Sequence, residues 1–475
     1  MKANPLFIAL LGILIVSVHA VYAIPTEEKP RVIVLTDIEN EPDDAQSLVR
    51  FLTYSNQFDV EGIIATTSVW LRNKTAEWRI HEILEAYKEV QPNLLKHEEG
   101  YPSYEELKAL TKAGIPEYGM LGVGEGKDSE GSDWIIEALK KDDPRPLWVL
   151  AWGGPNCLAQ ALWKLEQSES PEALESYVKK LRVYTISDQD DSGPWMRRNF
   201  PELFYICTPG YGHGGREGYH FATWSGISGD NFHGRFPGGD KEVISKEWIR
   251  ENVQENHGPL GTEYPDVAYL MEGDTPSFLY LIDNGLGCSE HPDYGSWGGR
   301  YEYYAPRTQL YFFEPETRPL WTNAMDEVFS KVDQQHHTGN HATIWRWRKD
   351  FQNDFAARMD WCTMSYDEVN HPPRVALAHD RIIETKEGEQ VILKADGCTD
   401  PDGDGLSYRW IYYREVGNSV YWLKMENEHS EESSFTAPVL GFPQEMHFIL
   451  ALTDDGTPSL TRYKRVIIKV SPKIE

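Results

Sequence analysis

The chain has 475 residues, of which 40% are apolar and 12% aromatic, and its formal net charge is −29. A chain of this length is expected to form two domains with a large buried core. The charge disfavours nucleic acid and anionic membranes as partners, because such polyanions attract clustered Lys and Arg. We therefore expect a neutral or cationic ligand.

The N-terminal segment predicts export. Lys2 precedes an apolar run over residues 6–18, and small residues follow at Ala20 and Ala23, an order typical of a cleaved secretory signal. We interpret residues 1–23 as a signal peptide and expect a secreted or periplasmic protein without a membrane span. The five cysteines form no short CxxC pair, and their odd number predicts at least one free thiol and no zinc site.

Strands and helices are predicted to alternate over residues 30–365. The run RVIVLTD at 31–37 reads as a strand, and apolar residues at 45, 48, 49 and 52 then follow helical spacing. A strand at 59–68 and a helix at 75–87 repeat the unit, and later strand-like runs end at Gly154, Asp188 and Asp274. This alternation predicts an α/β domain whose mostly parallel sheet has helices on both faces. Ligands bind such sheets at the carboxyl ends of the strands.

A helical pattern at 344–361 leads into a second domain, expected over residues 372–472. Its short alternating runs lie at 374–378, 389–395, 406–413, 433–437, 445–452 and 462–470. This spacing is typical of a β-sandwich. Asp400, Asp402 and Asp404 match the start of an EF-hand loop, but Ile411 stands where that loop needs Glu, so we predict a β-turn.

The most informative segment is DIENEPDD at residues 37–44, with five carboxylates in eight residues. Like charges raise one another's pKa, so ionising all five is costly unless a cation neutralises them. A carboxylate-rich set with a backbone carbonyl suits Ca²⁺ better than Mg²⁺. The alternative is a solvated acidic turn that caps the helix beginning near Asp43. The position at the end of the first strand favours the metal site.

The segment VIVLTDIENEPDDAQSL at 32–48 resembles the opening strand and acidic loop of the nucleoside hydrolases. GIIATTSVW, WGGPNCLAQAL and EGDTPSFLYLI resemble later segments of that family, so the similarity spans about Arg31 to Trp361. More closely, the chain resembles a secreted nucleoside-hydrolase-like subgroup labelled cellulose-binding proteins. Its C-terminal part resembles immunoglobulin-like and PKD-like modules.

The resemblance implies that Asp37, Asp44, Asp274 and a backbone carbonyl near Asn156 bind calcium, and that Asp37 is also the base for a nucleophilic water. Gly273 stands where nucleoside hydrolases often have a histidine that helps the nucleobase leave. The absence of that histidine disfavours a nucleobase as the leaving group.

The predicted substrate contacts lie in the acidic loop and near strand ends; they are Glu39, Asn40, Asp43, Trp70, Asp188, Trp195 and Glu272. Hydrolysis of an O-glycoside also needs a general acid that protonates the leaving oxygen. The candidates are Glu272, Asp188 and Glu41, each of which could instead be a surface or capping carboxylate. Tryptophans can stack on sugars, although most Trp residues are core packing. His213 and His233 are more readily explained as surface histidines than as site residues.

We therefore expect a calcium-dependent glycosidase that hydrolyses a furanoside or an oligosaccharide from polysaccharide breakdown, with carbohydrate as its partner. The alternatives are a non-catalytic carbohydrate-binding protein on a hydrolase scaffold and a nucleoside hydrolase. A phosphohydrolase with Asp37 as nucleophile ranks last, because no convincing partner Lys is found. The sequence is compatible with a homo-oligomer.

Overall fold

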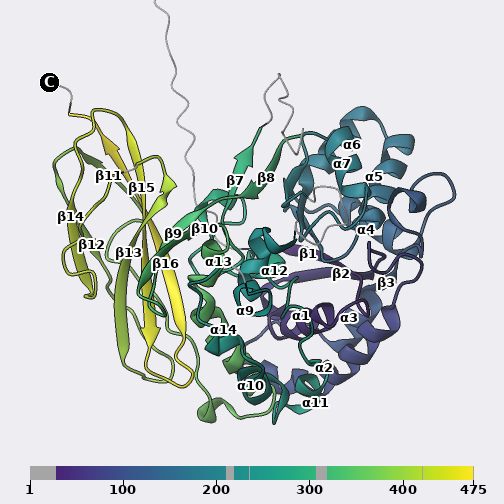
Figure 1. Cartoon of the computed structure of the whole chain (residues 1–475), viewed down its shortest axis with the longest axis horizontal. Coiled ribbons are helices and arrows are strands. Elements are labelled where there is room, and N and C mark those ends of the chain that lie inside the picture. Colours follow the sequence, from purple (N-terminus) through teal and green to yellow (C-terminus); the bar gives the residue numbers. More distant parts are fainter. Residues whose placement is uncertain (1–27, 210–218, 235, 306–317, 420, 474–475) are drawn as a thin grey trace, which may run out of the picture.

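The computed structural model describes residues 28–209, 219–234, 236–305, 318–419 and 421–473. The predicted signal peptide at 1–23 and His213 lie outside the described residues. Within the described part, no helix is both long and apolar enough to cross a membrane. The chain forms an α/β half and an all-β half that lie side by side (Figure 1).

The α/β half is built on an eight-stranded sheet with the order β3-β2-β1-β4-β5-β6-β8-β7. All neighbours are parallel except β7, which runs antiparallel to β8. The strands are β1 (Arg31–Thr36), β2 (Asp59–Ala65), β3 (Thr111–Ala113), β4 (Leu147–Ala151), β5 (Leu181–Thr185), β6 (Phe204–Ile206), β7 (Tyr301–Tyr304) and β8 (Leu320–Asn323).

Helices cover both faces of this sheet, which confirms the predicted architecture. They are α1 (Pro42–Thr53), α2 (Glu77–His97), α3 (Tyr104–Leu110), α4 (Glu130–Lys140), α5 (Asn156–Ser168), α6 (Pro171–Lys180), α7 (Ser192–Asn199), α9 (Gly229–Phe232), α10 (Lys246–Ile249), α11 (Gly258–Thr262), α12 (Pro276–Leu279), α13 (Ala342–Trp345) and α14 (Arg348–Asp360). Because side chains alternate along a strand, Val32 and Val34 of β1 enter the core shared with α1 and α2, whereas Ile33 and Leu35 enter the core shared with α4 and α5.

The all-β half contains the sheets β11-β16-β15-β13 and β12-β14, and a hairpin, β9 with β10, lies beside it (Figure 1). The hairpin strands are β9 (Asp326–Ser330) and β10 (Gln335–Gly339). The strands of the two sheets are β11 (Ile382–Lys386), β12 (Gln390–Lys394), β13 (Leu406–Gly417), β14 (Glu432–Thr436), β15 (Gln444–Asp454) and β16 (Thr461–Ser471). The two sheets enclose a separate apolar core, which confirms the predicted β-sandwich.

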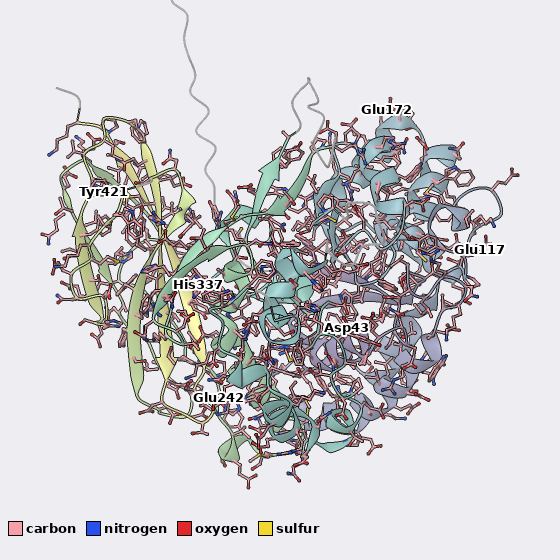
Figure 2. The ribbon with its side chains drawn as sticks, in the orientation of Figure 1. Asp43, Glu117, Glu172, Glu242, His337 and Tyr421 are labelled. Carbon is pink, nitrogen blue, oxygen red and sulfur yellow. The ribbon has the colours of Figure 1, made fainter. Side chains whose placement is uncertain are left out.

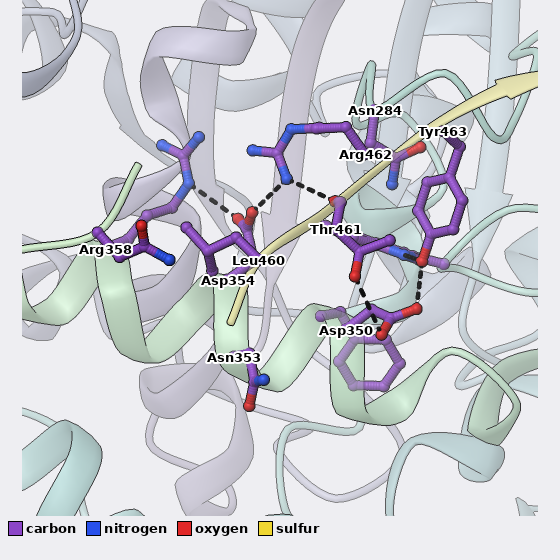
Figure 3. Close-up of polar contacts among 12 residues, drawn as sticks. Asn284, Asp350, Asn353, Asp354, Arg358, Leu460, Thr461, Arg462 and Tyr463 are labelled. Atoms are coloured by element: carbon purple, nitrogen blue, oxygen red, sulfur yellow. Dashed lines mark hydrogen bonds and ion pairs between the residues drawn. The ribbon is translucent and has the colours of Figure 1, made fainter. Parts of the chain in front are cut away.

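The larger of these sheets is buried on both faces. Phe448 and Leu450 of β15 enter the sandwich core, whereas the alternating residues Ile449 and Ala451 join the core of the α/β half. Polar contacts across the same interface are drawn in Figure 3, where Arg462 of β16 is paired at 2.6 Å with Asp354 of α14. The two halves therefore share packed and hydrogen-bonded structure.

Arg465 of β16 is a second element of this interface. It is 2% exposed and donates hydrogen bonds to the carbonyl oxygens of Leu286 at 2.6 Å and Tyr294 at 2.8 Å. Burial lowers the pKa of this guanidinium to about 10, and Tyr413 and Tyr294 oppose that shift. Arg465 therefore ties three backbone segments together from inside the protein.

Three predicted elements are wrong. Residues 266–274 form no strand, because Tyr269 and Glu272 adopt left-handed backbone with φ of 64° and 51°. The helix at 344–361 is broken into α13 and α14 around Trp347, whose ring packs at 5.5 Å on Tyr463. Residues 374–378 make only isolated bridges, whereas β11 was not predicted.

Candidate metal centre

The acidic loop lies between the end of β1 and the start of α1; two of its aspartates are buried and Asp43 is half-buried. Asp37 is 2% exposed and Asp44 is 3% exposed. The Thr36 hydroxyl donates to Asp44, and the backbone N–H of Ile38 donates to Thr36 Oγ1 at 3.1 Å. These contacts fix the loop against the strand end, so the carboxylates face the interior of the α/β half, where Figure 2 labels Asp43.

Asp274 joins this loop from the irregular segment that precedes α12. Carboxylate oxygens of Asp43, Asp44 and Asp274 lie within 4.8 Å of one another. Asp274 is 3% exposed, and its Oδ2 has no hydrogen-bond partner in the part of the chain described. A buried carboxylate oxygen without a partner is costly unless a cation or donor satisfies it.

Asn156, the first residue of α5, also has an oxygen without a partner. Its Nδ2 donates to the carbonyl of Glu117 at 2.8 Å, which turns the amide so that Oδ1 is left buried and without a partner among the described residues. The sequence implied only a backbone carbonyl near this residue. The side chain offers a further oxygen, and hard divalent ions prefer such oxygen ligands.

The pKa values of the clustered carboxyls are raised. Burial and, to a smaller extent, the charge of Glu41 raise the pKa of Asp37 to about 6. Burial, Glu41 and Asp37 raise the pKa of Asp43 to about 7. The pKa values of Asp44 and Asp274 lie well above the ordinary range because of burial and the neighbouring carboxylates. A donor set of this kind fits a divalent cation that would neutralise the carboxylates.

The turn after β4 brings two glycines to the centre. A Cβ atom on Gly153 would lie 2.7 Å from Asp37 Oδ1, and one on Gly154 would lie 2.4 Å from Asp190 Oδ2. Neither position has room for a side chain. The turn therefore allows two carboxyl groups to approach its backbone closely.

Asp190 is a carboxyl that the sequence analysis missed. It follows β5, is 4% exposed and accepts a hydrogen bond from the Ser192 N–H at 2.8 Å. Burial raises its pKa to about 7. The sequence did indicate a strand end at β5. Asp188 was chosen there as the site residue, whereas the buried carboxyl is that of Asp190, two positions later.

Comparisons with known proteins identify the family. Residues 31–301 match the model of the family described as "Cellulose-binding Sde182, nucleoside hydrolase-like domain", and residues 390–470 match that of the "Cellulose-binding protein Sde0182, C-terminal domain". The first match covers more than half of the chain. The chain belongs to this nucleoside hydrolase-like family.

A solved structure of a nucleoside hydrolase-related hypothetical protein from Saccharophagus degradans, described as associated with carbohydrate metabolism, is 35% identical. The similarity covers 94% of this chain and 100% of that chain, with a TM-score of 0.78. The PKD domain of the KIAA 1837 protein matches 22% of this chain and 91% of its own at 16% identity and a TM-score of 0.17. No curated protein matches the chain.

Two of the predicted substrate contacts are ion-paired carboxylates. Asp188 accepts two hydrogen bonds from Arg197, at 2.9 and 2.8 Å. Glu272 is fully buried and is held by Arg50 at 2.8 Å. Both carboxylates therefore stabilise the fold, because their oxygens bind guanidinium groups of the same chain.

The remaining predicted contacts are distributed around the loop. Glu39 is exposed, has a φ of 73° and pairs with Arg79 at 3.3 Å, so it points away from the buried aspartates. Asn40 is half-buried, and its N–H donates to the Asp37 carbonyl at 3.1 Å. The ring of Trp195 packs 5.7 Å from that of Phe200, beside the core that β1 shares with α4 and α5, so the structure does not bring it to this centre.

Trp70 lies at the exposed end of a line of aromatic rings. It is 42% exposed, its ring lies 6.5 Å from Tyr219, and Tyr219 lies 6.0 Å from Trp224. At the inner end, a Cβ on Gly273 would lie 3.1 Å from Trp224 and 2.8 Å from Asp43 Oδ2. The aromatic line therefore leads from the surface to the acidic cluster.

Two other predicted features lie apart from the acidic cluster. His233 stacks on His220, with ring centroids 4.2 Å apart. Asp400, Asp402 and Asp404 bring carboxylate oxygens within 4.8 Å of one another, and Asp400 Oδ1 accepts hydrogen bonds from the N–H groups of Asp402 and Asp404. The chain bends at residues 401 and 402, and the β-turn expected there stays a prediction.

Proposed function

We propose that this protein is a calcium-dependent hydrolase of glycosyl bonds that acts on a furanoside or an oligosaccharide from polysaccharide breakdown. The observation that carries the proposal is the carboxylate cluster of Asp43, Asp44 and Asp274 beside Asp37, the residue that follows β1 at its carboxyl end. The aromatic line from Trp70 adds a surface that suits sugar rings.

Asp37, Asp44, Asp274 and an oxygen of Asn156 would hold the calcium ion. Carboxylate and amide oxygens are the ligands that calcium prefers, and it tolerates their irregular placement. When bound, the ion would orient sugar hydroxyls and make a water molecule more acidic. Asp43 lies close enough to contact the same ion or the sugar.

Asp37 would act as the general base. Hydrolysis of a glycosyl bond passes through an oxocarbenium-like transition state, and a water must be deprotonated as it attacks the anomeric carbon. Calcium bound beside Asp37 would favour its ionised form, which is the form that accepts a proton. Thr36 and Ile38 keep the loop in place during the reaction.

The test is release of reducing sugar from plant and algal oligosaccharides, and of base from nucleosides, with calcium or with a chelator. Calcium-dependent cleavage of an oligosaccharide would support the proposal. Cleavage of nucleosides alone would refute its substrate class. The family name describes cellulose binding, so the second candidate is a non-catalytic carbohydrate-binding protein; glycan binding without turnover would favour it.

Calcium is expected to raise the melting temperature at pH 7.5. The raised pKa of Asp37 stabilises the metal-free protein below pH 3.8, and this stabilisation is lost as pH rises through about 6. Calcium at 100 to 1,000 times its dissociation constant should restore about 3 to 4 kcal/mol. Differential scanning calorimetry with calcium and with chelator measures the shift.

Asp274→Asn is the matched variant for that measurement. It removes one buried charge, so the metal-free protein should be at least as stable as the wild type at pH 7.5, while the shift produced by calcium should shrink. Asp142→Asn, at an exposed carboxyl outside both carboxylate clusters, should leave the shift unchanged. An equal calcium shift in wild type and Asp274→Asn would contradict the proposed ligand set.

Gly153→Ala is expected to lower activity without unfolding the protein. Its Cβ would lie 2.7 to 2.9 Å from three atoms of Asp37, so the carboxyl must move away from its position. A displacement of about 1 Å in a catalytic group can cost about 100-fold in rate. Initial rates and circular dichroism check this result, and Gly339→Ala, which meets no atom within 4 Å, is the control.

A further inference from the structure

Hydrolysis of an O-glycoside requires a protonated acid at the leaving oxygen. The structure removes two of the three predicted candidates, because Asp188 is paired with Arg197 and Glu272 is paired with Arg50. The oxygens of both carboxylates are already engaged by Arg197, or by Arg50 and Tyr264, so neither group is free to contact a leaving oxygen. Glu41, the third candidate, lies on the same loop as the proposed base, and its charge raises the pKa of Asp37.

Asp190 has the arrangement that an acid requires. Its Oδ1 accepts hydrogen bonds from the N–H and the hydroxyl of Ser192, which fixes the carboxyl plane. Its Oδ2 is buried and has no partner among the described residues. That free oxygen faces the glycine turn after β4, where only the missing side chain of Gly154 leaves it room.

The strand order places Asp190 opposite Asp37. Asp37 follows β1 and Asp190 follows β5, and β4 lies between these two strands. The turn after β4 joins the two groups, because its consecutive glycines Gly153 and Gly154 face Asp37 and Asp190, respectively. The base and the acid that glycoside hydrolysis needs can therefore be supplied from two sides of one turn.

Trp70 and Arg72, which lie on one loop, contact two tyrosine rings, and each ring lies near one of the two carboxyls. Trp70 lies against Tyr219, whose pKa is raised by burial and also by the charge of Asp37. Two residues further on, Arg72 lies 4.7 Å above the ring of Tyr118, whose pKa is raised by burial and by the charge of Asp190. The ring of Tyr219 therefore lies near Asp37 and that of Tyr118 near Asp190, and such rings are surfaces on which the sugars of an oligosaccharide could stack.

We propose that Asp190 is the general acid and that the substrate is an O-glycoside whose leaving group is a sugar hydroxyl; this rests on the proposed hydrolytic function. A water oxygen bonds to the anomeric carbon as the glycosidic C–O bond breaks. The electron pair of that bond goes to the leaving oxygen, which takes the proton from Asp190 Oδ2. Asp37 takes the proton of the water, and exchange with solvent restores both groups. Burial, which favours the protonated form of Asp190, supports this role.

The experiment compares leaving groups in calcium-containing buffer. Initial rates are measured for wild type, Asp190→Asn and Asp142→Asn on cellotetraose, on xylo- and arabino-oligosaccharides, and on the 2,4-dinitrophenyl glycosides of the same sugars. Dinitrophenolate leaves without protonation, whereas a sugar hydroxyl does not. Asp190→Asn should lose about 10²- to 10⁴-fold on the oligosaccharide and less than about 10-fold on the dinitrophenyl glycoside. Asp142→Asn, at an exposed carboxyl, should behave as wild type.

Equal loss on both kinds of substrate would overturn the acid role and make Asp190 a binding residue. No turnover of any glycoside by the wild type would instead refute the proposed hydrolysis. A second readout is independent of turnover: the infrared difference between calcium-loaded wild type and Asp190→Asn at pH 6 should contain the carbonyl band of a protonated carboxyl. Absence of that band would overturn the acid role by itself.

Discussion

Asp37→Asn is expected to lower glycoside hydrolysis by about 10²- to 10⁴-fold, because the amide keeps the shape of the carboxyl but cannot accept a proton from water. The loss should affect activated and natural substrates alike, since both need the attacking water. The same variant should not destabilise the metal-free protein at pH 7.5, where the raised pKa of the buried Asp37 carboxyl makes its ionised form unfavourable.

The measurement combines initial rates with melting temperatures in chelator, and Asp142→Asn, an exposed carboxyl, is the control. Retained activity in a folded Asp37→Asn protein would show that another group deprotonates the water. A fall in melting temperature without metal would show that Asp37 stabilises the fold in a way that its burial does not explain.

Removal of residues 372–475 is expected to prevent the α/β half from folding into a soluble, cooperatively melting protein. The deletion exposes the apolar surface that Ile449, Ala451 and Tyr463 cover. It also removes Arg462 from buried Asp354, which keeps Arg358, at 3.1 Å, as its remaining ion-pair partner. Expression, near-ultraviolet circular dichroism and calorimetry measure the result.

A point variant tests the same interface in the full chain. Arg465→Met removes the donors that satisfy the carbonyls of Leu286 and Tyr294, and each buried carbonyl left unpaired costs about 1 to 3 kcal/mol. Ile392→Ser, at a half-exposed position of β12, is the control and should change the melting temperature little. A shortened chain that melts like the full protein would contradict the structural role of the interface.

The sequence was sufficient to predict the part of the candidate site whose residues are adjacent in the chain. The charges of the acidic loop are adjacent in the chain, and the apolar run before them identifies the strand end, so the buried Asp37 and Asp44 could be selected without coordinates. Asp190 could not be selected in that way. Asp188 and Asp190 both follow β5, and only the contact of Asp188 with Arg197 distinguishes the paired carboxylate from the free one.

Long-range contacts explain the other errors. The run at 266–274 alternates like a strand, but Glu272 is fixed by Arg50, which lies 222 residues away, and its backbone is left-handed. The alternation of β15 predicted one buried face, whereas both of its faces are buried, because residues such as Ile449 pack on the other half. Local patterns contain no information about such partners.

The double burial of the β15–β16 sheet also has a consequence for the order in which the chain folds. Tyr463 and Arg465 contact Trp297 and Leu286, partners separated from them by 166 and 179 residues. Contacts over such separations close large loops and are made slowly. The face of the α/β half that packs on β15 and β16 thus stays uncovered until β16 has been synthesised. A chain with this property depends on one of its last strands to complete the fold of its first half.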